Sequence, residues 1–194
     1  MTQFWRGTPV FVTGHTGFKG SWLSLVLARL GADVHGFSVD VPTRPAMFDV
    51  VGVSDHLASD VRADVRTPDA VRAAMAASAP RVVFHLAAQP LVLAGYDDPV
   101  ATFDTNVMGT VRVLDAVRDV PSVDAVVVVT SDKCYDAASC ERPLRESDRL
   151  GGDDPYSASK AATELVVHAY RAGFGAAAGA ARIASVRAGN VIGG

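Results

Sequence analysis

The stretch that decides the fold is Val10-Phe11-Val12-Thr13-Gly14-His15-Thr16-Gly17-Phe18-Lys19-Gly20. A short apolar run ends there in glycines spaced three apart, and an amphipathic run begins at residue 21. A strand, a glycine turn and a helix in this order present backbone amides to a phosphate. Gly14 permits the sharp turn, Gly17 the approach of a pyrophosphate, and Gly20 close packing of the helix on the strand. Because ordinary turns also use glycine, a plain turn is the alternative to a dinucleotide site.

Strand-like and helix-like patterns alternate along the rest of the chain. Strands are expected at residues 9–13, 34–39, 59–65, 81–87, 125–130 and 182–187, and helices at 21–30, 68–78, 99–118 and 155–173. The first helix is expected to bury Trp22, Leu23, Leu25, Val26 and Leu30. This alternation predicts an α/β fold, a doubly wound parallel sheet of the Rossmann type with helices on both sides. Ligands of such sheets bind at the carboxyl ends of the strands.

The composition is that of an ordinary globular protein. A chain of 194 residues, 49% hydrophobic and 20% charged, suits one domain with a substantial core. The net charge of −3 provides no field that would attract nucleic acid or an anionic membrane, so neither partner is expected. The chain shows no secretory signal and no membrane-spanning apolar run, which predicts a cytoplasmic location. Cys134 and Cys140 are expected to be reduced thiols, and the scattered histidines predict no metal site.

The strongest catalytic signal is Tyr156-Ser157-Ala158-Ser159-Lys160. On a helix, Tyr156 and Lys160 share a face, and an ammonium beside a phenol lowers the pKa of the phenol towards that of a working base. The alternative is a surface tyrosine and a solvated lysine. Ser131-Asp132-Lys133 follows the valine-rich strand directly and is expected to enter the same crevice. These side chains can act as a hydrogen-bond partner for a substrate oxygen, a proton donor and a proton acceptor. The alternative is that they only cap a turn.

Three further positions each allow two interpretations, two at strand ends and one inside the helix predicted at 99–118. Asp64 can accept a hydrogen bond from an adenine amino group, or it can cap the next helix. The small residues of Leu86-Ala87-Ala88 either admit a flat cofactor or pack closely. Asn106, which has low helix propensity, either bridges backbone groups across the sheet or is solvated.

Together these residues resemble the extended short-chain dehydrogenase/reductase family of nucleotide-sugar enzymes over essentially the whole chain. The cofactor turn of that family matches residues 12–20, its fourth-strand motif matches His85-Leu86-Ala87-Ala88-Gln89, and its catalytic pair matches Tyr156 and Lys160. Within the family, the chain is most similar to the CDP-glucose 4,6-dehydratase branch. The runs that carry this similarity are residues 14–23, 130–135, 150–157 and 187–194. Dehydratases for other nucleotide sugars usually carry Asp-Glu where this chain has Asp132-Lys133.

The resemblance implies an NAD-dependent, redox-neutral removal of water from a nucleotide sugar. Tyr156 would take the proton of the sugar 4-hydroxyl, Ser131 would bond the 4-oxygen, and Lys160 would hold the nicotinamide ribose. Lys133, as a neutral amine, would take the C5 proton, and Asp132 would protonate the departing 6-hydroxyl. Beside Tyr156 and Lys160, the implied cofactor-binding residues are Gly14, His15, Thr16, Gly17, Phe18, Lys19, Gly20, Ser38, Asp64, Val65, Leu86, Ala87, Ala88 and Thr105. The implied substrate-binding residues are Gln89 and Asn190.

The resemblance also bears on domains, cofactor choice and assembly. Relatives continue past Gly194 into a smaller domain that grips the nucleotide, so residues 1–194 are expected to be the NAD-binding Rossmann domain with that C-terminal domain mostly absent. NAD is preferred, with Ser38 on a ribose 2′-hydroxyl, although Arg44 can meet the 2′-phosphate of NADP. A homodimer through a four-helix interface is implied, with apolar surface from Ala161, Ala162, Leu165, Val166 and Val167. The alternative functions are an epimerase, another nucleotide-sugar dehydratase, or a cofactor-binding fragment without catalysis.

Overall fold

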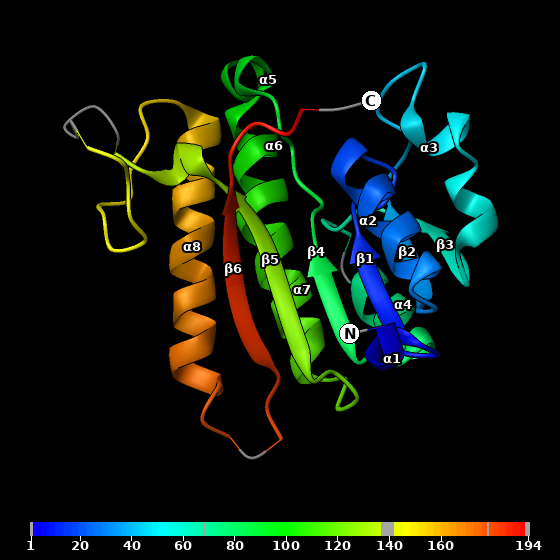
Figure 1. The fold of residues 1–194 in the computed structure, drawn as a ribbon. Coiled ribbons are helices and arrows are strands. Elements are labelled where there is room, and N and C mark those ends of the chain that lie inside the picture. The colour runs from blue at the N-terminus through cyan, green and yellow to red at the C-terminus, as the bar shows by residue number, and fades with distance from the viewer. Residues whose placement is uncertain (1, 68, 137–141, 178, 193–194) are drawn as a thin grey trace.

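The computed structural model describes residues 2–67, 69–136, 142–177 and 179–192. Its strands are β1 (Pro9–Thr13), β2 (Asp33–Ser38), β3 (Ser59–Arg62), β4 (Val82–His85), β5 (Ala125–Ser131) and β6 (Arg182–Ala188). They form one 6-stranded sheet in the order β3-β2-β1-β4-β5-β6, and every neighbouring pair is parallel (Figure 1). The order runs outward from β1 in one direction and from β4 in the other. This is the doubly wound arrangement, so the predicted fold class is confirmed.

The helices are α1 (Thr2–Trp5), α2 (Phe18–Arg29), α3 (Met47–Val50), α4 (Ala70–Ser78), α5 (Val92–Asp97), α6 (Pro99–Phe103), α7 (Gly109–Arg118) and α8 (Pro155–Phe174). Short helical turns are η1 (Val53–His56), η2 (Asp104–Met108) and η3 (Asp132–Cys134). The helix predicted at 99–118 is therefore α6, a π-helical turn η2, and α7 in succession. Residue 68, expected to begin a helix, and Cys140 lie outside the described residues. Among the helices that the structure describes, none has the length and apolar character needed to cross a membrane.

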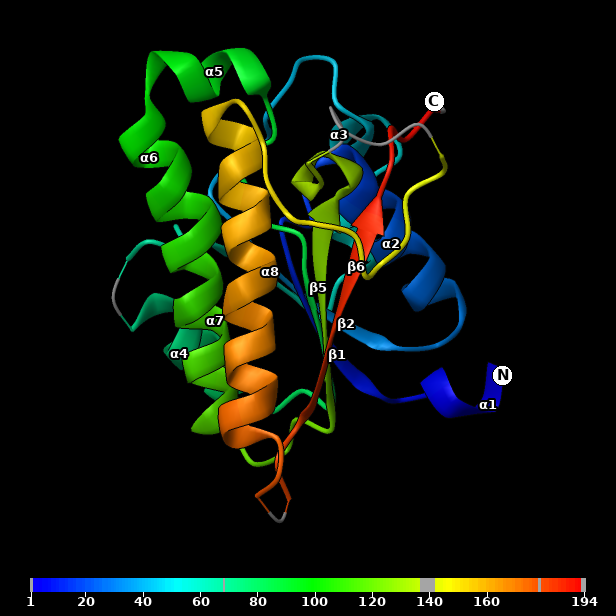
Figure 2. The same ribbon diagram turned by 90° about the vertical axis from the view of Figure 1, so that its left-hand side faces the viewer.

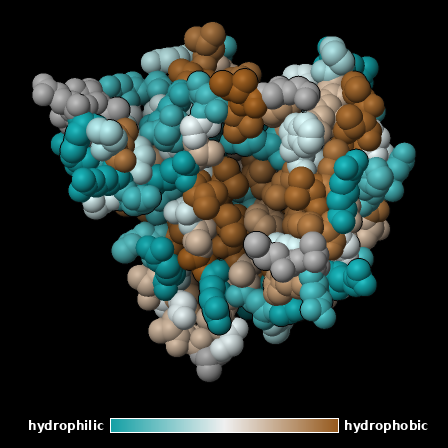
Figure 3. Space-filling model, in the orientation of Figure 1, coloured by the Kyte–Doolittle hydropathy of each residue, from teal (hydrophilic) through white to brown (hydrophobic). Residues whose placement is uncertain are grey.

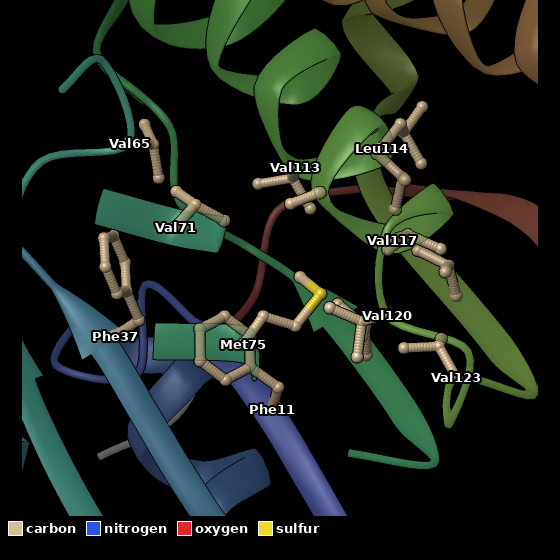
Figure 4. Close-up of a cluster of buried hydrophobic side chains, with 14 of the residues drawn as sticks. Phe11, Phe37, Val65, Val71, Met75, Val113, Leu114, Val117, Val120 and Val123 are labelled. Atoms are coloured by element: carbon tan, nitrogen blue, oxygen red, sulfur yellow. The ribbon is translucent and has the colours of Figure 1, made fainter. Parts of the chain in front are cut away.

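The helices form two layers around the sheet. Figure 2 shows α4, α7 and α8 on one side of the sheet and α2 on the other. The larger core lies under α4 and α7, where Phe11, Phe37, Met75 and Leu114 are fully buried (Figure 4). Burial of an apolar side chain of this size contributes about 1.5–3 kcal/mol, so this layer holds the central strands firmly beneath the loops at their carboxyl ends.

The buried face of α2 differs from the prediction. The residues that face the sheet are Gly20, Ser21, Ser24 and Leu27, whereas Trp22 and Val26 are 44% and 49% exposed. The cause is the close approach of the helix to the turn, because a Cβ on Gly20 would lie 2.0 Å from the carbonyl oxygen of Gly14. Only small residues fit there, and they fix a helix rotation that turns the larger apolar side chains outward.

Apolar side chains remain exposed on β6 and on α8, among other places. Apolar side chains gather on the face of β5 and β6 opposite α7 and α8, where Val127 and Val129 are half-buried and Val186 is exposed (Figure 3). On α8, Leu165 is 61% exposed. Ala161 and Val167, expected on the same dimer surface, are instead buried because they face the inside of the helical layer.

Candidate functional site

A cleft of about 650 Å³ opens at the carboxyl ends of the strands. Of the predicted site residues, the cleft is lined by Gly14, Thr16, Gly17, Phe18, Lys19, Gly20, Ser38, Asp64, Val65, Leu86, Ala87, Ala88, Gln89, Thr105, Ser131, Lys133, Tyr156, Lys160 and Asn190. His15 and Asp132 are the predicted residues that do not line it. No group of three or more His, Cys, Asp or Glu side chains suited to a metal occurs in the described part of the chain.

The glycine turn forms one wall of this cleft. Gly14 has a φ of +73°, and a Cβ at this position would lie 2.7 Å from the backbone nitrogen of Ala87. Glycine is therefore required both by the left-handed backbone and by the contact with the end of β4. Gly17 is the N-cap of α2 and offers no side chain to the first amides of the helix. A helix N-terminus of this kind, open to a cleft, is suited to hold a phosphate group.

The structure places the side chain of His15 away from the cleft. His15 is fully buried beneath the turn, and its Nε2 lies 2.9 Å from Oδ1 of Asp60 on β3. The left-handed conformation of Gly14 reverses the chain, and Gly36 on β2 leaves room for the imidazole ring below. The expected direct contact of this side chain with a cofactor is therefore not supported.

The carboxyl end of β2 forms a polar corner of the cleft. The hydroxyl of Thr16 lies 2.8 Å from the Ser38 hydroxyl, and it donates to the carbonyl oxygen of Asp40 at 2.6 Å. Asp40 lines the cleft, whereas Arg44 is not among the lining residues. Asp40 was not predicted as a site residue because it lies two residues beyond the end of β2. The signal in the sequence that could have identified it is an acidic residue just after the second strand. The corner thus offers hydroxyl and carboxylate oxygens to a ligand.

Asp64 is paired with Arg66, and both line the cleft. The guanidinium and the backbone amide of Arg66 donate to the carboxylate over 2.7–3.1 Å. These hydrogen bonds, opposed in part by burial, hold the pKa of Asp64 below its ordinary value. Asp64 does not cap α4, whose N-cap residue is Asp69.

The Ser131-Asp132-Lys133 turn follows β5 directly. The Ser131 hydroxyl accepts from the backbone amide of Lys133 at 3.2 Å and donates to Oδ1 of Asp132 at 3.1 Å, so Ser131 caps η3 and also lines the cleft. Asp132 is exposed and lies towards the end of β6, with Oδ2 3.7 Å from where a Cβ of Gly189 would stand. The Lys133 side chain is also exposed, and it lines the cleft.

Tyr156 and Lys160 face the cleft from α8 and are only 8% and 6% exposed. Burial, with the charge of Lys19 adding to it, lowers the pKa of Lys160 to about 8. Burial also raises the pKa of Tyr156, and the Asp132 and Asp154 carboxylates add to this, while a hydrogen bond with Ser131 opposes it. The predicted lowering of the tyrosine pKa is therefore wrong for this structure, because burial and nearby carboxylates outweigh the favourable contacts.

Asn106 is buried in the π-helical turn and connects two walls of the cleft. Its Oδ1 accepts a hydrogen bond from the backbone amide of Gln89 at 2.8 Å. Its Nδ2 donates to the backbone carbonyl of Gln89 at 3.1 Å and to the Ser159 hydroxyl at 2.8 Å. The bridging role predicted for this residue is confirmed. It ties the segment after β4 to α8, one residue from Lys160.

A buried ionic network behind α8 was not anticipated. Oε2 of Glu164 accepts from Ser185 at 3.0 Å and from Arg187 at 2.9 Å, and Oε1 accepts from Thr130. The spacing of Tyr156, Lys160 and Glu164 places all three on one face of a helix, which was the signal in the sequence. The network joins β5, β6 and α8 next to the catalytic candidates.

The NAD dependent epimerase/dehydratase family matches residues 10–194, and the chain belongs to this family. It is 50% identical over 196 residues to CDP-glucose 4,6-dehydratase of Salmonella typhimurium, covering 99% of this chain and 54% of the relative. UDP-glucose 4-epimerase from Brucella ovis, solved in complex with NAD, is 26% identical with a TM-score of 0.77, covering 93% of this chain and 51% of that one. Epimerase Mth375 from Methanothermobacter thermautotrophicus has the same fold, with a TM-score of 0.80 at 22% identity over 96% of this chain and 52% of that one. The chain spans about half the length of the curated relatives it matches.

Proposed function

We propose that the chain is the cofactor-binding and catalytic portion of a 4,6-dehydratase that converts CDP-glucose to CDP-4-keto-6-deoxyglucose with NAD. The observation that carries this proposal is the convergence of Ser131, Lys133 and the Tyr156–Lys160 pair at one cleft that the glycine turn also lines, with Asp132 hydrogen-bonded to Ser131 beside it. The 50% identity to a CDP-glucose 4,6-dehydratase supports the choice of nucleotide sugar. Residues 1–194 would form the NAD-binding Rossmann domain, with the nucleotide-gripping domain outside them.

The residues of the cleft fit a dinucleotide. The amides at the start of α2 suit its pyrophosphate, and the oxygens at Ser38 and Asp40 suit the hydroxyls of an unphosphorylated ribose, which favours NAD over NADP. Leu86, Ala87 and Ala88 present apolar surface along which the cofactor would lie, and Lys160, which lines the cleft, would hold the nicotinamide ribose. When bound, NAD would supply a hydride acceptor that takes hydride from C4 of the sugar and returns it to C6.

The side chains would move the protons that accompany this hydride. Tyr156, in its deprotonated form, would take the proton of the 4-hydroxyl while Ser131 hydrogen-bonds the 4-oxygen. The resulting 4-keto group acidifies C5, Lys133 removes the C5 proton, and Asp132 protonates the hydroxyl that leaves C6 as water. Lys133 would then return its proton to C5. The proton gained by Tyr156 and the proton lost by Asp132 cancel, so the net change is the loss of one water.

The test is to incubate the protein, in a form that includes the nucleotide-gripping domain, with NAD and equal concentrations of CDP-, dTDP-, GDP- or UDP-glucose in separate reactions, and to assay each 4-keto-6-deoxy product by its absorbance in base. Preferential conversion of CDP-glucose is expected. Preference for another donor would reject the CDP assignment, and 4-epimers in place of keto sugars would indicate an epimerase. Binding of NAD without turnover, by a chain with a sharp thermal transition, would indicate a cofactor-binding module.

We also propose that the protein is a homodimer through the outer surface of α6, α7 and α8. These helices lie side by side on the same side of the sheet (Figures 1 and 2). Exposed apolar residues on them are Val100, Phe103, Leu165 and Phe174. Burial of these side chains against a second copy would remove apolar surface from water, which is the main favourable contribution to association.

A further inference from the structure

His15 belongs to the glycine turn, but its side chain makes its contacts with Asp60 and Phe48 on the far side from the cleft. Its Nε2 is 2.9 Å from Asp60, and the Asp60 carboxylate also receives Nε and Nη2 of Arg62 at 2.8 and 2.7 Å. The Arg62 guanidinium lies 4.9 Å from the centroid of the Phe48 ring, and Phe48 meets the His15 ring edge-on at 5.5 Å. His15, Phe48, Asp60 and Arg62 thus form a closed set of contacts, here named the His15 cluster, which joins the turn to α3 and β3.

The direction of the hydrogen bond between His15 and Asp60 follows from the chemistry of the cluster. Burial raises the pKa of Asp60, but the hydrogen bonds and charges of Arg62 and His15 outweigh it, so the carboxylate is ionised and can only accept. Nε2 of His15 must therefore carry a proton and donate it. Burial lowers the pKa of His15 and outweighs the opposing charge of Asp60 and a hydrogen bond with the Phe37 backbone, so the pKa shift favours the neutral ring.

The ring fits because residue 36 has no side chain. A Cβ on Gly36 would lie 2.5 Å from Cδ2 of His15, closer than real carbon contacts allow. Gly36 is in the middle of β2, where glycine is otherwise disfavoured, and its backbone pairs with Val12 and Asp60 on the neighbouring strands. His15 and Gly36 are therefore a matched pair, in which a large ring on the turn requires an empty position on the strand.

The same turn meets the cleft on its opposite side. Thr16, the next residue, bonds Ser38 and the Asp40 carbonyl at the polar corner, and the His15 carbonyl accepts from Ser21 in the first turn of α2 at 3.2 Å. We propose that His15 is a positioning residue for the dinucleotide: the His15 cluster fixes the turn from below, so that Thr16 and Gly17 are held where the cofactor meets them. The inference rests on the proposed NAD-dependent function.

The first experiment titrates the 194-residue chain and its variants with NAD and NADH, by calorimetry and nicotinamide fluorescence. His15→Ala should weaken binding roughly 10–100-fold, the usual effect of losing a group that orients a binding residue. His15→Gln, whose amide can donate to Asp60 in place of Nε2, should recover most of this loss. The matched control is His35→Ala, because His35 also bridges β2 and β3, at 2.9 Å from Ser59, but is not among the cleft residues. It should change binding less than about twofold.

The second experiment tests the pairing with Gly36 by thermal melts that need no ligand. Gly36→Ala should lower the melting temperature sharply in the original chain and much less when combined with His15→Ala. Equal effects of Gly36→Ala in both backgrounds would overturn the packing argument, and unchanged NAD affinity in a folded His15→Ala variant would overturn the positioning role. If the unaltered chain melts sharply but binds neither form of the cofactor, the proposed function fails first, and the inference fails with it.

Discussion

Oε2 of Glu164 lies 2.9 Å from the guanidinium of Arg187, and both side chains are largely buried, at 5% and 17% exposure. Burial alone would raise the pKa of Glu164, but hydrogen bonds from Arg187, Thr130 and Ser185 outweigh it and leave the pKa lowered. The pair therefore stabilises the fold above the ordinary pKa of a glutamate, and this stability is lost as the pH falls through the lowered value. Because Glu164 is one helical turn from Lys160, the pair helps to fix the face of α8 that lines the cleft.

We expect Arg187→Met to lower the free energy of unfolding at pH 7 by about 3–5 kcal/mol, because it leaves a buried carboxylate without its counter-charge. The double variant Glu164→Gln/Arg187→Met should recover much of this loss, since no buried charge remains. Urea denaturation at pH 7 measures both. Arg182→Met, at an exposed position of the same strand, is the control and should change stability by less than about 0.5 kcal/mol. Additive effects in the double variant would contradict the ion pair.

Lys160 is expected to destabilise the folded chain at neutral pH. Its pKa is about 8 in the folded chain against an ordinary 10.5, so the folded state disfavours the charged form. The penalty is complete below about pH 8 and vanishes as the pH approaches 10.5. Lys160→Met should therefore raise the free energy of unfolding by roughly 3 kcal/mol at pH 7 and by much less at pH 10. Lys133→Met, at an exposed position, should have little effect at either pH, and a gain for Lys160→Met that is independent of pH would refute this account.

Tyr156→Phe should reduce kcat with CDP-glucose by about 10²–10⁴-fold, because the 4-hydroxyl would lose its proton acceptor. The Kd for NAD should stay within about twofold, since the phenyl ring keeps the shape of the cleft wall. Tyr170→Phe, on the same helix but away from the cleft, is the matched control. Product formation in the assay with four nucleotide sugars and a separate NAD titration distinguish the two effects. A normal kcat for Tyr156→Phe would remove the tyrosine from the proposed mechanism.

Lys133→Met should separate the oxidation step from the loss of water. Without an acceptor for the C5 proton, the chain would still oxidise C4, so reduced nicotinamide should accumulate when CDP-glucose is added to the NAD-loaded protein. Formation of the 4-keto-6-deoxy sugar should fall by at least about 10²-fold. The nicotinamide absorbance and the incorporation of deuterium at C5 report the two steps. Wild-type rates of deuterium incorporation in this variant would assign the C5 proton to another residue.

The proposed dimer depends on apolar surface at Leu165, which is 61% exposed on α8. We expect the unaltered chain to have twice its monomer mass in light scattering, and Leu165→Glu to shift it to the monomer, because an unpaired charge would be buried at the interface. His168→Glu, also at an exposed position of α8, tests whether any added charge on the helix has this effect. A monomeric unaltered chain would reject the dimer.

The order of the elements and the place of the cleft could be predicted because both follow from local patterns. Alternating strand and helix signals imply a parallel sheet, and the ends of parallel strands meet at one edge. Tyr156 and Lys160 were found by the same reasoning, since helical spacing alone puts them on one face. Asn106 was found because a residue of low helix propensity inside the helix predicted at 99–118 suggested a bridging role, although the π-helical turn itself was not predicted.

The rotation of a helix about its axis and contacts between residues far apart in the sequence could not be predicted in this way. The apolar pattern of α2 indicated Trp22 and Val26 as buried, but the close contact of Gly20 with Gly14 determined which face packs. His15 was predicted to contact the cofactor because it lies inside the glycine turn. Its side chain is instead buried away from the cleft, in space that is free because Gly36 has no side chain. The pKa of Tyr156 likewise depends on burial and on two carboxylates, Asp132 and Asp154, that lie far from each other in sequence.

The π-helical turn at Asp104–Met108 inserts one extra residue into the rod formed by α6 and α7. One residue of an α-helix corresponds to a rotation of about 100°, so the two halves of the rod present different faces to the sheet. Below the turn, Val113 and Leu114 enter the apolar core, while at the turn Asn106 meets Gln89 and Ser159 beside the cleft. The inserted residue thus lets one segment pack against the apolar core at one end and line a polar cleft at the other. Deletion of that residue would rotate Asn106 away from Gln89 and Ser159, although the composition of the chain would hardly change.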